Sequence, residues 1–182
     1  MIDVLVRPDQ LDGPDRRGLV DCWVAVTNAG GAVGFPFPPV DVAEVAPAVD
    51  ELASELDPGR CVLFRSRSDG AVQGWVVLRR STSYLVSHWA TVERLQTLPR
   101  YRGRGIARDL MASLEGYARD ELGVEQLRLA ARGGLGLEGY YEAQGWREVG
   151  RWPRALRLAA DDVRDEVLMA KALGTPPVVD AD

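Results

Sequence analysis

The sequence predicts a single domain of the mixed α/β class. The chain has 182 residues, of which 46% are hydrophobic, and this is enough for one sizeable core. Segments with the two-residue period of a strand are interspersed with segments that have the period of a helix. In the second half, a glycine-rich turn joins a strand to the most regular helix of the chain, and a further strand follows. The expected order is strand, two helices, three strands, helix, strand, helix and two strands.

Hydrophobic periodicity locates the elements of the first half, and glycine or proline bounds most of them. The strands alternate apolar and polar side chains, whereas the helices carry apolar residues at spacings of three and four. The segment Ser68-Asp69-Gly70 is typical of a hairpin turn. The expected elements are a strand at 2–7, a helix at 16–29, a loop at 34–39, a helix from Asp41 to before Pro58, and strands at 61–65 and 72–79.

The second half contains the clearest helix, which starts at Ile106 and is expected to end at Gly123. Residues 1–173 are expected to form the domain. The polar, proline-containing segment 174–182 is expected to be a flexible tail. The other expected elements are a strand at 88–98, a short strand around 124–129, a helix at 138–144, and strands at 146–151 and 166–173 separated by a loop through Pro153.

The turn before this helix combines four arginines with two glycines in a chain whose net charge is −5. Glycine has no Cβ, so the backbone there can approach a ligand closely. The free N–H groups and the dipole of the helix favour an anion at its first turn, and arginine adds planar donors suited to phosphate. The pattern therefore predicts a pyrophosphate-binding site, and the alternative is a solvated turn. The residues are Arg100, Arg102, Gly103, Arg104, Gly105 and Arg108.

Other classes of binding site fit the sequence less well. The glycines of the turn do not follow the Gly-x-Gly-x-x-Gly spacing of a dinucleotide-binding unit, and no Gly-Lys-Ser/Thr of a P-loop occurs. The acidic charge balance disfavours nucleic acid as a partner. Two cysteines without metal or redox spacing and a single histidine disfavour a metal centre.

The cellular setting is expected to be the cytoplasm, without a membrane partner. No apolar run approaches the roughly 18 residues that span a bilayer, and residues 1–8 lack the basic and apolar regions of a secretory signal. A positive site on an acidic chain suits an anionic cofactor and is compatible with a cationic acceptor. Formation of a homodimer is left open.

Two motifs resemble those of the GNAT superfamily of acyl-CoA-dependent N-acetyltransferases. Residues 102–107, Arg-Gly-Arg-Gly-Ile-Ala, match the pattern Arg/Gln-x-x-Gly-x-Gly/Ala, and Pro99 lies three residues before them. A second frame that begins at Arg100 also fits, but the position of Pro99 favours the first. Residues 140–146, Tyr-Tyr-Glu-Ala-Gln-Gly-Trp, are similar to the aromatic-Tyr-Glu-x-x-Gly-aromatic segment of this family. The resemblance extends over roughly residues 2–173.

The resemblance implies a mostly antiparallel sheet of about seven strands, flanked by about four helices and splayed after its fourth strand. The pantetheine arm of acetyl-CoA would lie in the gap, and its pyrophosphate would bind the turn. The implied activity is transfer of an acetyl group to a primary amine of a small molecule, without a metal. The alternatives are an acyl-CoA-binding or sensor module without turnover and a protein N-acetyltransferase. The implied cofactor-binding residues are Leu95, Gln96, Thr97, Arg102, Gly103, Arg104, Gly105, Ile106, Ala107 and Arg108.

Two residues are candidates for catalysis. By the resemblance, Tyr141 occupies the position of a tyrosine that donates a proton to the departing CoA sulfur, and the alternative is a tyrosine that only packs. Glu93 is the first candidate for the base that takes the amine proton. Strand alternation predicts that Glu93, Leu95 and Thr97 share one face of the sheet. The alternatives for Glu93 are a surface ion pair with Arg94 and a proton relay through water.

Aromatic residues are the candidates for binding the acceptor amine. Phe35 and Phe37 lie in the loop between the first two helices, a segment that often covers the acceptor in the GNAT superfamily. Trp89 and Trp152 would complete an aromatic wall. The alternative is that these side chains pack on one another at the edge of the core.

Overall fold

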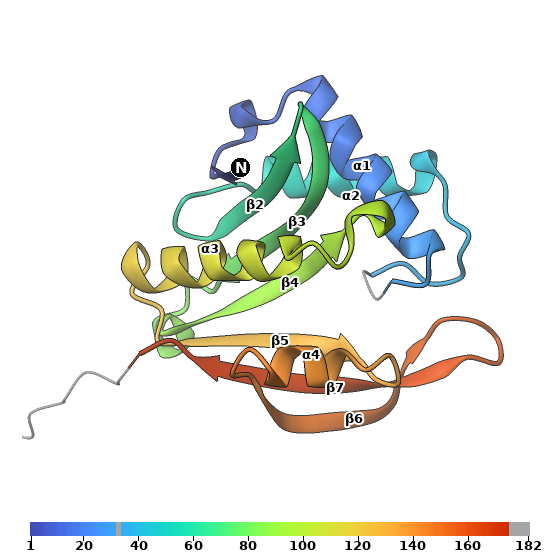
Figure 1. Cartoon of the computed structure of the whole chain (residues 1–182). Helices are drawn as coiled ribbons and strands as arrows, with labels where there is room; N and C mark the ends of the chain where they lie inside the picture. The colour runs from blue at the N-terminus through green and yellow to red at the C-terminus, as the bar shows by residue number, and fades with distance from the viewer. Residues whose placement is uncertain (32–33, 175–182) are drawn as a thin grey trace, which may run out of the picture.

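A computed structural model describes residues 1–31 and 34–174 of the chain. They form one seven-stranded sheet with the order β1-β2-β3-β4-β5-β7-β6, together with four α-helices (Figure 1). Only the β4–β5 pair is parallel. The predicted mixed sheet of seven strands with four helices is therefore confirmed. The elements are β1 (Ile2–Leu5), α1 (Gly13–Asn28), α2 (Val42–Ser54), β2 (Cys61–Ser68), β3 (Ala71–Arg80), β4 (Trp89–Thr97), α3 (Ile106–Asp120), β5 (Gln126–Arg132), α4 (Leu137–Glu142), β6 (Arg147–Arg157) and β7 (Val163–Ala172).

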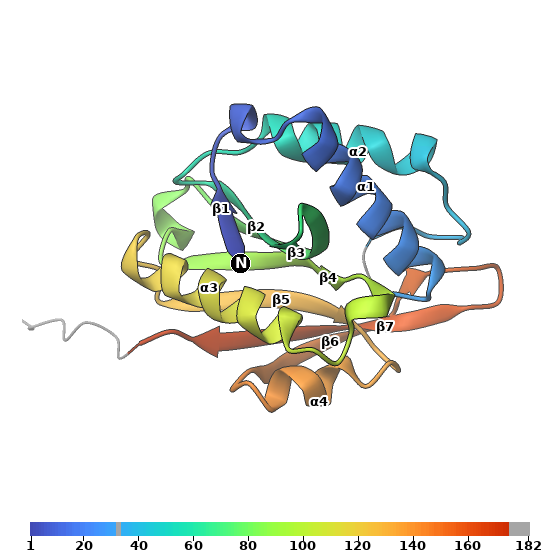
Figure 2. The ribbon, with the colours of Figure 1, turned by 45° about the horizontal axis from the view of Figure 1, so that its top comes forward.

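Helices cover both faces of the sheet (Figure 2). The α1 and α2 helices bury one face, and α3 and α4 bury the other. Within β3, Trp75 and Val77 belong to the core under α1, whereas Val76 and Leu78 belong to the core under α3. This division follows the two-residue period of a strand. The sheet therefore has two hydrophobic faces, each with its own layer of helices.

The sheet splits between β4 and β5. These strands pair over only three residues, the last pair being Thr91 with Arg128. Beyond that point β4 remains paired with β3, and β5 remains paired with β7 up to Arg132. The two halves of the sheet diverge there (Figure 1). The predicted splay after the fourth strand is confirmed, and it leaves one edge of β4 without a neighbouring strand.

A bulge in β4 reverses its side-chain alternation. Glu93 lies opposite Val77 of β3, and the register then shifts so that Arg94 and Leu95 face a single residue of β3. Arg94 has a φ of 57°. Leu95 packs on the core under α3, whereas Val77 lies in the core under α1. The prediction that Glu93 shares a face with Leu95 and Thr97 is therefore wrong, because the two-residue period fails across a bulge.

The first long helix begins earlier than predicted. It starts at Gly13 and not at residue 16. The Asp12 side chain accepts a hydrogen bond of 2.7 Å from the backbone N–H of Asp15, which is the geometry of an N-cap. Pro14 occupies the first turn, where its missing N–H costs nothing. The start signal, Asp12 and Pro14, lies before the apolar stripe that indicates this helix in the sequence.

The sixth strand continues through Pro153, where a loop was predicted. Proline cannot donate a hydrogen bond to a neighbouring strand. Here β6 is the edge strand of the sheet, and its pairing with β7 is interrupted between Trp152 and Leu156. Pro153 lies inside this interruption, so its missing N–H leaves no bond unmade. The hairpin formed by β6 and β7 is consequently longer than expected.

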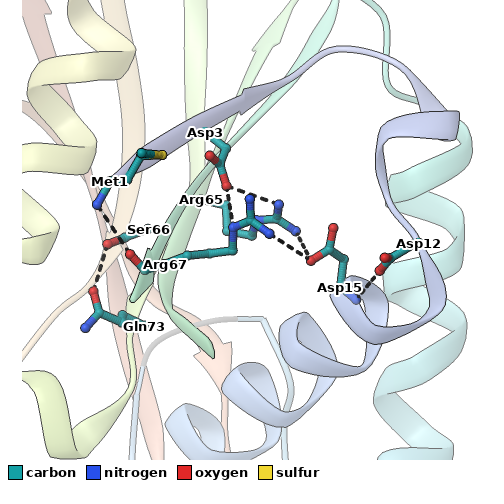
Figure 3. A network of polar contacts seen from close by, with 8 residues as sticks. All are labelled: Met1, Asp3, Asp12, Asp15, Arg65, Ser66, Arg67 and Gln73. Carbon is teal, nitrogen blue, oxygen red and sulfur yellow. Dashed lines mark hydrogen bonds and ion pairs between the residues drawn. The ribbon is translucent and has the colours of Figure 1, made fainter. Parts of the chain in front are cut away.

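Four charged residues tie the N-terminal elements together, and we call them the Arg65 cluster (Figure 3). Arg65 of β2 contacts Asp3 of β1 at 3.1 Å and Asp15 of α1 at 2.6 Å. Arg67 contacts the same two carboxylates, at 2.6 Å and 3.6 Å. The Arg65 side chain is only 2% exposed. Its buried charge is therefore compensated by carboxylates of the fold itself.

Three further observations concern the rest of the chain. Of the predicted tail at 174–182, only Gly174 is described, and residues 175–182 lie outside the described residues. Among the described residues, no helix combines the length and apolar character that crossing a bilayer requires. Cys22 and Cys61 are free thiols buried in the structure.

Candidate active site

Two adjoining cavities lie where the sheet splits. The first has a volume of about 710 Å³ and extends from the turn before α3 along β4 to α4 and the end of α1. The second has a volume of about 570 Å³ and is lined by residues of the loop after α1, of β4 and β5, and of the β6–β7 hairpin. Val92, Arg94, Ala130 and Ala131 line both cavities. A molecule in one cavity would therefore lie next to a molecule in the other.

The turn before α3 presents unpaired backbone N–H groups to the first cavity. Gly103 and Gly105 have φ values of 76° and 82°, which only glycine adopts readily. Gly105 is the N-cap of α3, and no side chain caps the helix. The first N–H groups of a helix have no acceptor within the helix. The turn therefore offers donors to an anion at the positive end of the α3 dipole.

Nine of the ten predicted cofactor residues line the first cavity, and Arg104 is the exception. The guanidinium groups of Arg100 and Arg104 lie over the ring of Tyr101, at 5.0 Å and 5.4 Å from its centroid. Arg102 and Arg108 line the cavity itself. A Cβ at Gly105 would lie only 3.2 Å from the guanidinium of Arg108. A side chain at this position would therefore compete for space with the Arg108 guanidinium.

The free edge of β4 forms one wall of the first cavity. Leu95, Gln96 and Thr97 line this cavity beyond the point where β5 leaves β4. Gln96 is 3% exposed, and both polar atoms of its side chain lack a hydrogen-bond partner among the described residues. A strand edge in this state offers backbone donors and acceptors to an extended ligand. An extended molecule with amide groups could therefore pair with β4 in place of a strand.

Tyr141 lies on the buried side of α4 and lines the first cavity at the opposite wall. Its ring contacts Tyr140 and Trp146 edge to face, with centroids 5.2 Å and 5.8 Å apart. Burial raises the pKa of the Tyr141 hydroxyl well above its ordinary value. The phenol therefore remains protonated at physiological pH and is suited to donate a proton.

Glu93 lines the second cavity and not the first. Its Oε2 accepts a hydrogen bond of 2.8 Å from Nε of Arg79, which also contacts Glu55 at 2.6 Å. The alternative of an ion pair between Glu93 and Arg94 is wrong, because the Arg94 guanidinium lies 4.7 Å over the ring of Trp23. The bulge at Arg94 turns the two side chains apart. Glu93 is thus held at the wall of the compartment next to the first cavity.

The four aromatic candidates do not form one wall. Phe35 lines the second cavity and packs edge to face on Trp23. Phe37 is 58% exposed, and its backbone N–H donates to the carbonyl of Leu158 at 2.8 Å. Trp89 lies at the start of β4 beneath Arg128, away from both cavities. Trp152 is exposed on β6, outside both cavities. Of these four residues, only Phe35 therefore lines either cavity.

The second cavity contains charged residues that no sequence motif indicates. They are Arg132 at the end of β5, Arg157 on the β6–β7 hairpin and Glu166 of β7. These residues meet only because β7 returns between β5 and β6, so no local pattern reveals them.

Among the described residues, no group of three or more His, Cys, Asp or Glu side chains is arranged to hold a metal ion.

Comparisons with known proteins agree with this geometry. The model of the acetyltransferase (GNAT) family matches residues 17–146. The ribosomal-protein-S18-alanine N-acetyltransferase of Escherichia coli is 17% identical, with a TM-score of 0.71 and 100% of each chain covered. An aminoglycoside 6'-N-acetyltransferase complexed with coenzyme A is 14% identical, with a TM-score of 0.72 and coverage of 97% of this chain and 99% of that one.

A Salmonella typhimurium protein solved with its cofactor acetyl-CoA is 13% identical, with a TM-score of 0.70 and coverage of 100% of this chain and 99% of that one. These structures share the fold, whereas the family match covers more than half of the sequence and includes both the turn before α3 and Tyr141. The chain therefore belongs to the GNAT family of acetyltransferases, which identifies it as an acetyl-transferring enzyme.

Proposed function

We propose that this chain is an acetyl-CoA-dependent N-acetyltransferase that acetylates a primary amine of a small molecule. The observation that carries the proposal is the first cavity, which connects the arginine–glycine turn of α3 to Tyr141. A CoA thioester needs an anion-binding group at one end and a proton donor near its sulfur. The second cavity provides a separate space in which the amine approaches the thioester.

The residues of the first cavity fit coenzyme A. The backbone N–H groups after Gly105 and the guanidinium groups of Arg102 and Arg108 suit a pyrophosphate. The free edge of β4 at Leu95 to Thr97 suits the amide groups of the pantetheine arm. A side chain in place of Gly105 would displace the Arg108 guanidinium and would strain the turn at its positive φ. We assign cofactor binding to these backbone and arginine groups.

The chemistry requires two proton movements. The amine nitrogen forms a bond to the thioester carbonyl carbon, and the carbon–sulfur bond breaks. We propose that the Tyr141 hydroxyl donates a proton to the departing sulfur, because burial keeps this hydroxyl protonated. We propose that Glu93 accepts, directly or through water, the proton that the amine loses, because Glu93 lines the second cavity. The hydrogen bond from Arg79 fixes the orientation of this carboxylate.

The shape of the second cavity favours a small acceptor. The loop after α1 and the tip of the β6–β7 hairpin are joined by the hydrogen bond from Phe37 to Leu158, and both contribute residues to the wall of the cavity. A volume of about 570 Å³ suits a metabolite-sized molecule.

Acetyl transfer from isotope-labelled acetyl-CoA to a mixture of small-molecule amines tests the proposal. We expect labelled amide products and free CoA in equal amounts. Binding of acetyl-CoA without transfer to any amine would favour the acyl-CoA-binding alternative. Transfer only to the N-terminus of a peptide or protein would contradict the small-molecule acceptor.

A further inference from the structure

The second cavity contains more uncompensated positive charge than negative charge. Arg94, Arg132 and Arg157 line it, and none of them has a carboxylate within ion-pair distance among the described residues. Arg94 lies over Trp23, and Arg157 donates to the carbonyl of Ala160 at 3.3 Å. Neither contact carries a negative charge.

The carboxylates of this region are largely engaged elsewhere. Glu93 is held by Arg79, and Asp162 is held by Arg164 through two hydrogen bonds. Asp165 accepts from the backbone N–H of Arg154 at 2.9 Å. Only Glu166 lines the cavity without an ion pair among the described residues. The lining residues therefore comprise three arginines and two glutamates, of which Glu93 is paired with Arg79, so positive charge is in excess in a chain whose net charge is −5.

Arg132 is the best placed of the three to bind an anion. It lies directly opposite Glu166 in the β5–β7 pairing, so both side chains leave the same face of the sheet. Its Nε is buried and has no hydrogen-bond partner among the described residues. Burial lowers the pKa of the Arg132 guanidinium, a sign that solvent has been lost without full compensation by a negative charge. A buried guanidinium donor without an acceptor is costly unless a ligand satisfies it.

We propose that the acceptor of this enzyme is an amine that also carries a carboxylate, as a free amino acid does. Its carboxylate binds Arg132, with Arg157 and Arg94 contributing charge, and its amine points to the wall that the two cavities share. Arginine suits this role because its planar donors bind a carboxylate through two hydrogen bonds. Polycationic amines would be repelled. This inference rests on the proposed function, since it names the substrate class of the same acetyl transfer.

Matched acceptors test the inference at saturating acetyl-CoA, with the release of free CoA as the readout. The acceptors are L-glutamate, L-methionine, L-alanine and L-phenylalanine, each beside its α-carboxamide, with spermidine and a short peptide as further amines. We expect at least one free amino acid to react with a kcat/KM at least about tenfold above that of its carboxamide and of spermidine. The carboxamide has the less basic amine and hence more of the neutral form, so this preference reports on binding and not on reactivity.

Arginine variants locate the effect. We expect Arg132→Gln to raise the KM for the free amino acid about tenfold, with little change in the KM for its carboxamide or for acetyl-CoA. Arg157→Gln should act in the same direction, and because Arg157 is exposed it keeps the test usable if Arg132→Gln does not fold. Arg147→Gln is the matched control, since Arg147 is exposed on β6 outside the cavity.

Several outcomes would overturn the inference. They are equal reactivity of acids and carboxamides, acetylation of spermidine or the peptide alone, or no reaction with any free amino acid while CoA still binds in calorimetry. Absence of CoA binding would instead overturn the proposed function. The two failures are therefore distinguishable.

Discussion

Two groups of arginines in this chain differ in what compensates their charge. In the Arg65 cluster, Arg65 and Arg67 contact Asp3 and Asp15, and the Arg65 side chain is 2% exposed (Figure 3). At the turn before α3, Arg100 and Arg104 lie over Tyr101, and Arg102 and Arg108 line an open cavity. The first group is paired with carboxylates of the fold. In the second group Arg108 contacts the exposed Asp109 at 3.4 Å, and the remaining positive charge is available to a ligand.

This difference suggests a general way to separate structural from ligand-binding arginines. A buried arginine with carboxylates from two other segments of the chain contributes to the stability of the fold. An arginine beside positive-φ glycines and an uncapped helix N-terminus contributes little to stability and much to anion binding. Substitutions in the two groups should therefore affect different measurements.

The largest expected effect on stability is that of Arg65→Met. It leaves Asp3 and Asp15 partly buried with only Arg67 to compensate them, and we expect a loss of about 3 kcal/mol in the free energy of unfolding. Urea denaturation measures this loss. Arg67→Met is the matched control, because Arg67 is 37% exposed and its loss should cost about 1 kcal/mol or less. Equal costs for the two variants would show that burial does not set the contribution of this cluster.

Gly105→Glu should have the largest effect on cofactor binding. The new side chain meets Arg108, requires a strained φ and places a negative charge where the pyrophosphate would lie. Loss of two or more charge-assisted hydrogen bonds predicts weaker CoA binding by on the order of 100-fold. Gly116→Glu is the control, since Gly116 lies within α3 with open space around it. Calorimetry measures the CoA affinity of both folded variants. If Gly105→Glu and Gly116→Glu bind CoA with comparable affinity, the turn is not the binding site.

Tyr141→Phe should lower turnover by on the order of 100-fold and leave CoA affinity nearly unchanged, because only the hydroxyl is removed. The raised pKa of Tyr141 also predicts that the wild-type rate does not fall on account of this group below about pH 10. Because the folded protein favours the neutral hydroxyl of Tyr141, this group contributes its full share to the free energy of unfolding below about pH 10. That share is lost as the pH rises further. Steady-state kinetics over a pH series test both statements, and wild-type turnover in the variant would reduce Tyr141 to a packing role.

Glu93→Gln is expected to give the smallest effect of the four. It removes basicity but keeps shape, and we expect the rate to fall by about tenfold because water can partly replace the carboxylate. The hydrogen bond to Arg79 predicts an accompanying stability change below about 1 kcal/mol. An unchanged rate and pH profile with a small stability change would leave Glu93 as a partner of Arg79 only.

The order of elements and the turn before α3 could be predicted because local residues determine them. Gly103, Gly105 and the apolar stripe from Ile106 lie within one stretch of the chain, and hydrophobic periodicity reports directly on which side of a helix is buried. The bulge at Arg94 could not be predicted in this way. It depends on the register of β4 against β3, and Arg94 is not a glycine whose presence would signal a positive φ.

The acceptor side of the site was the least predictable. Arg132, Arg157 and Glu166 come from three strands that meet only through the order β5-β7-β6. Trp89 was a reasonable aromatic candidate, yet the parallel pairing of β4 and β5 places it at the end opposite the split. Non-local pairing decides which residues face this cavity, and no short motif encodes it.

Calorimetric titration of the wild-type chain with CoA and with pantetheine tests most directly the claim that the turn before α3 binds a pyrophosphate. The two ligands share the arm that would lie along β4, and CoA adds the pyrophosphate together with 3′-phosphoadenosine, so the same pair of titrations on Gly105→Glu assigns the difference to the turn. We predict that CoA binds at least about 100-fold more tightly than pantetheine, and that its affinity falls as salt is raised. Equal affinities, or no binding of CoA to the folded chain, would contradict the account.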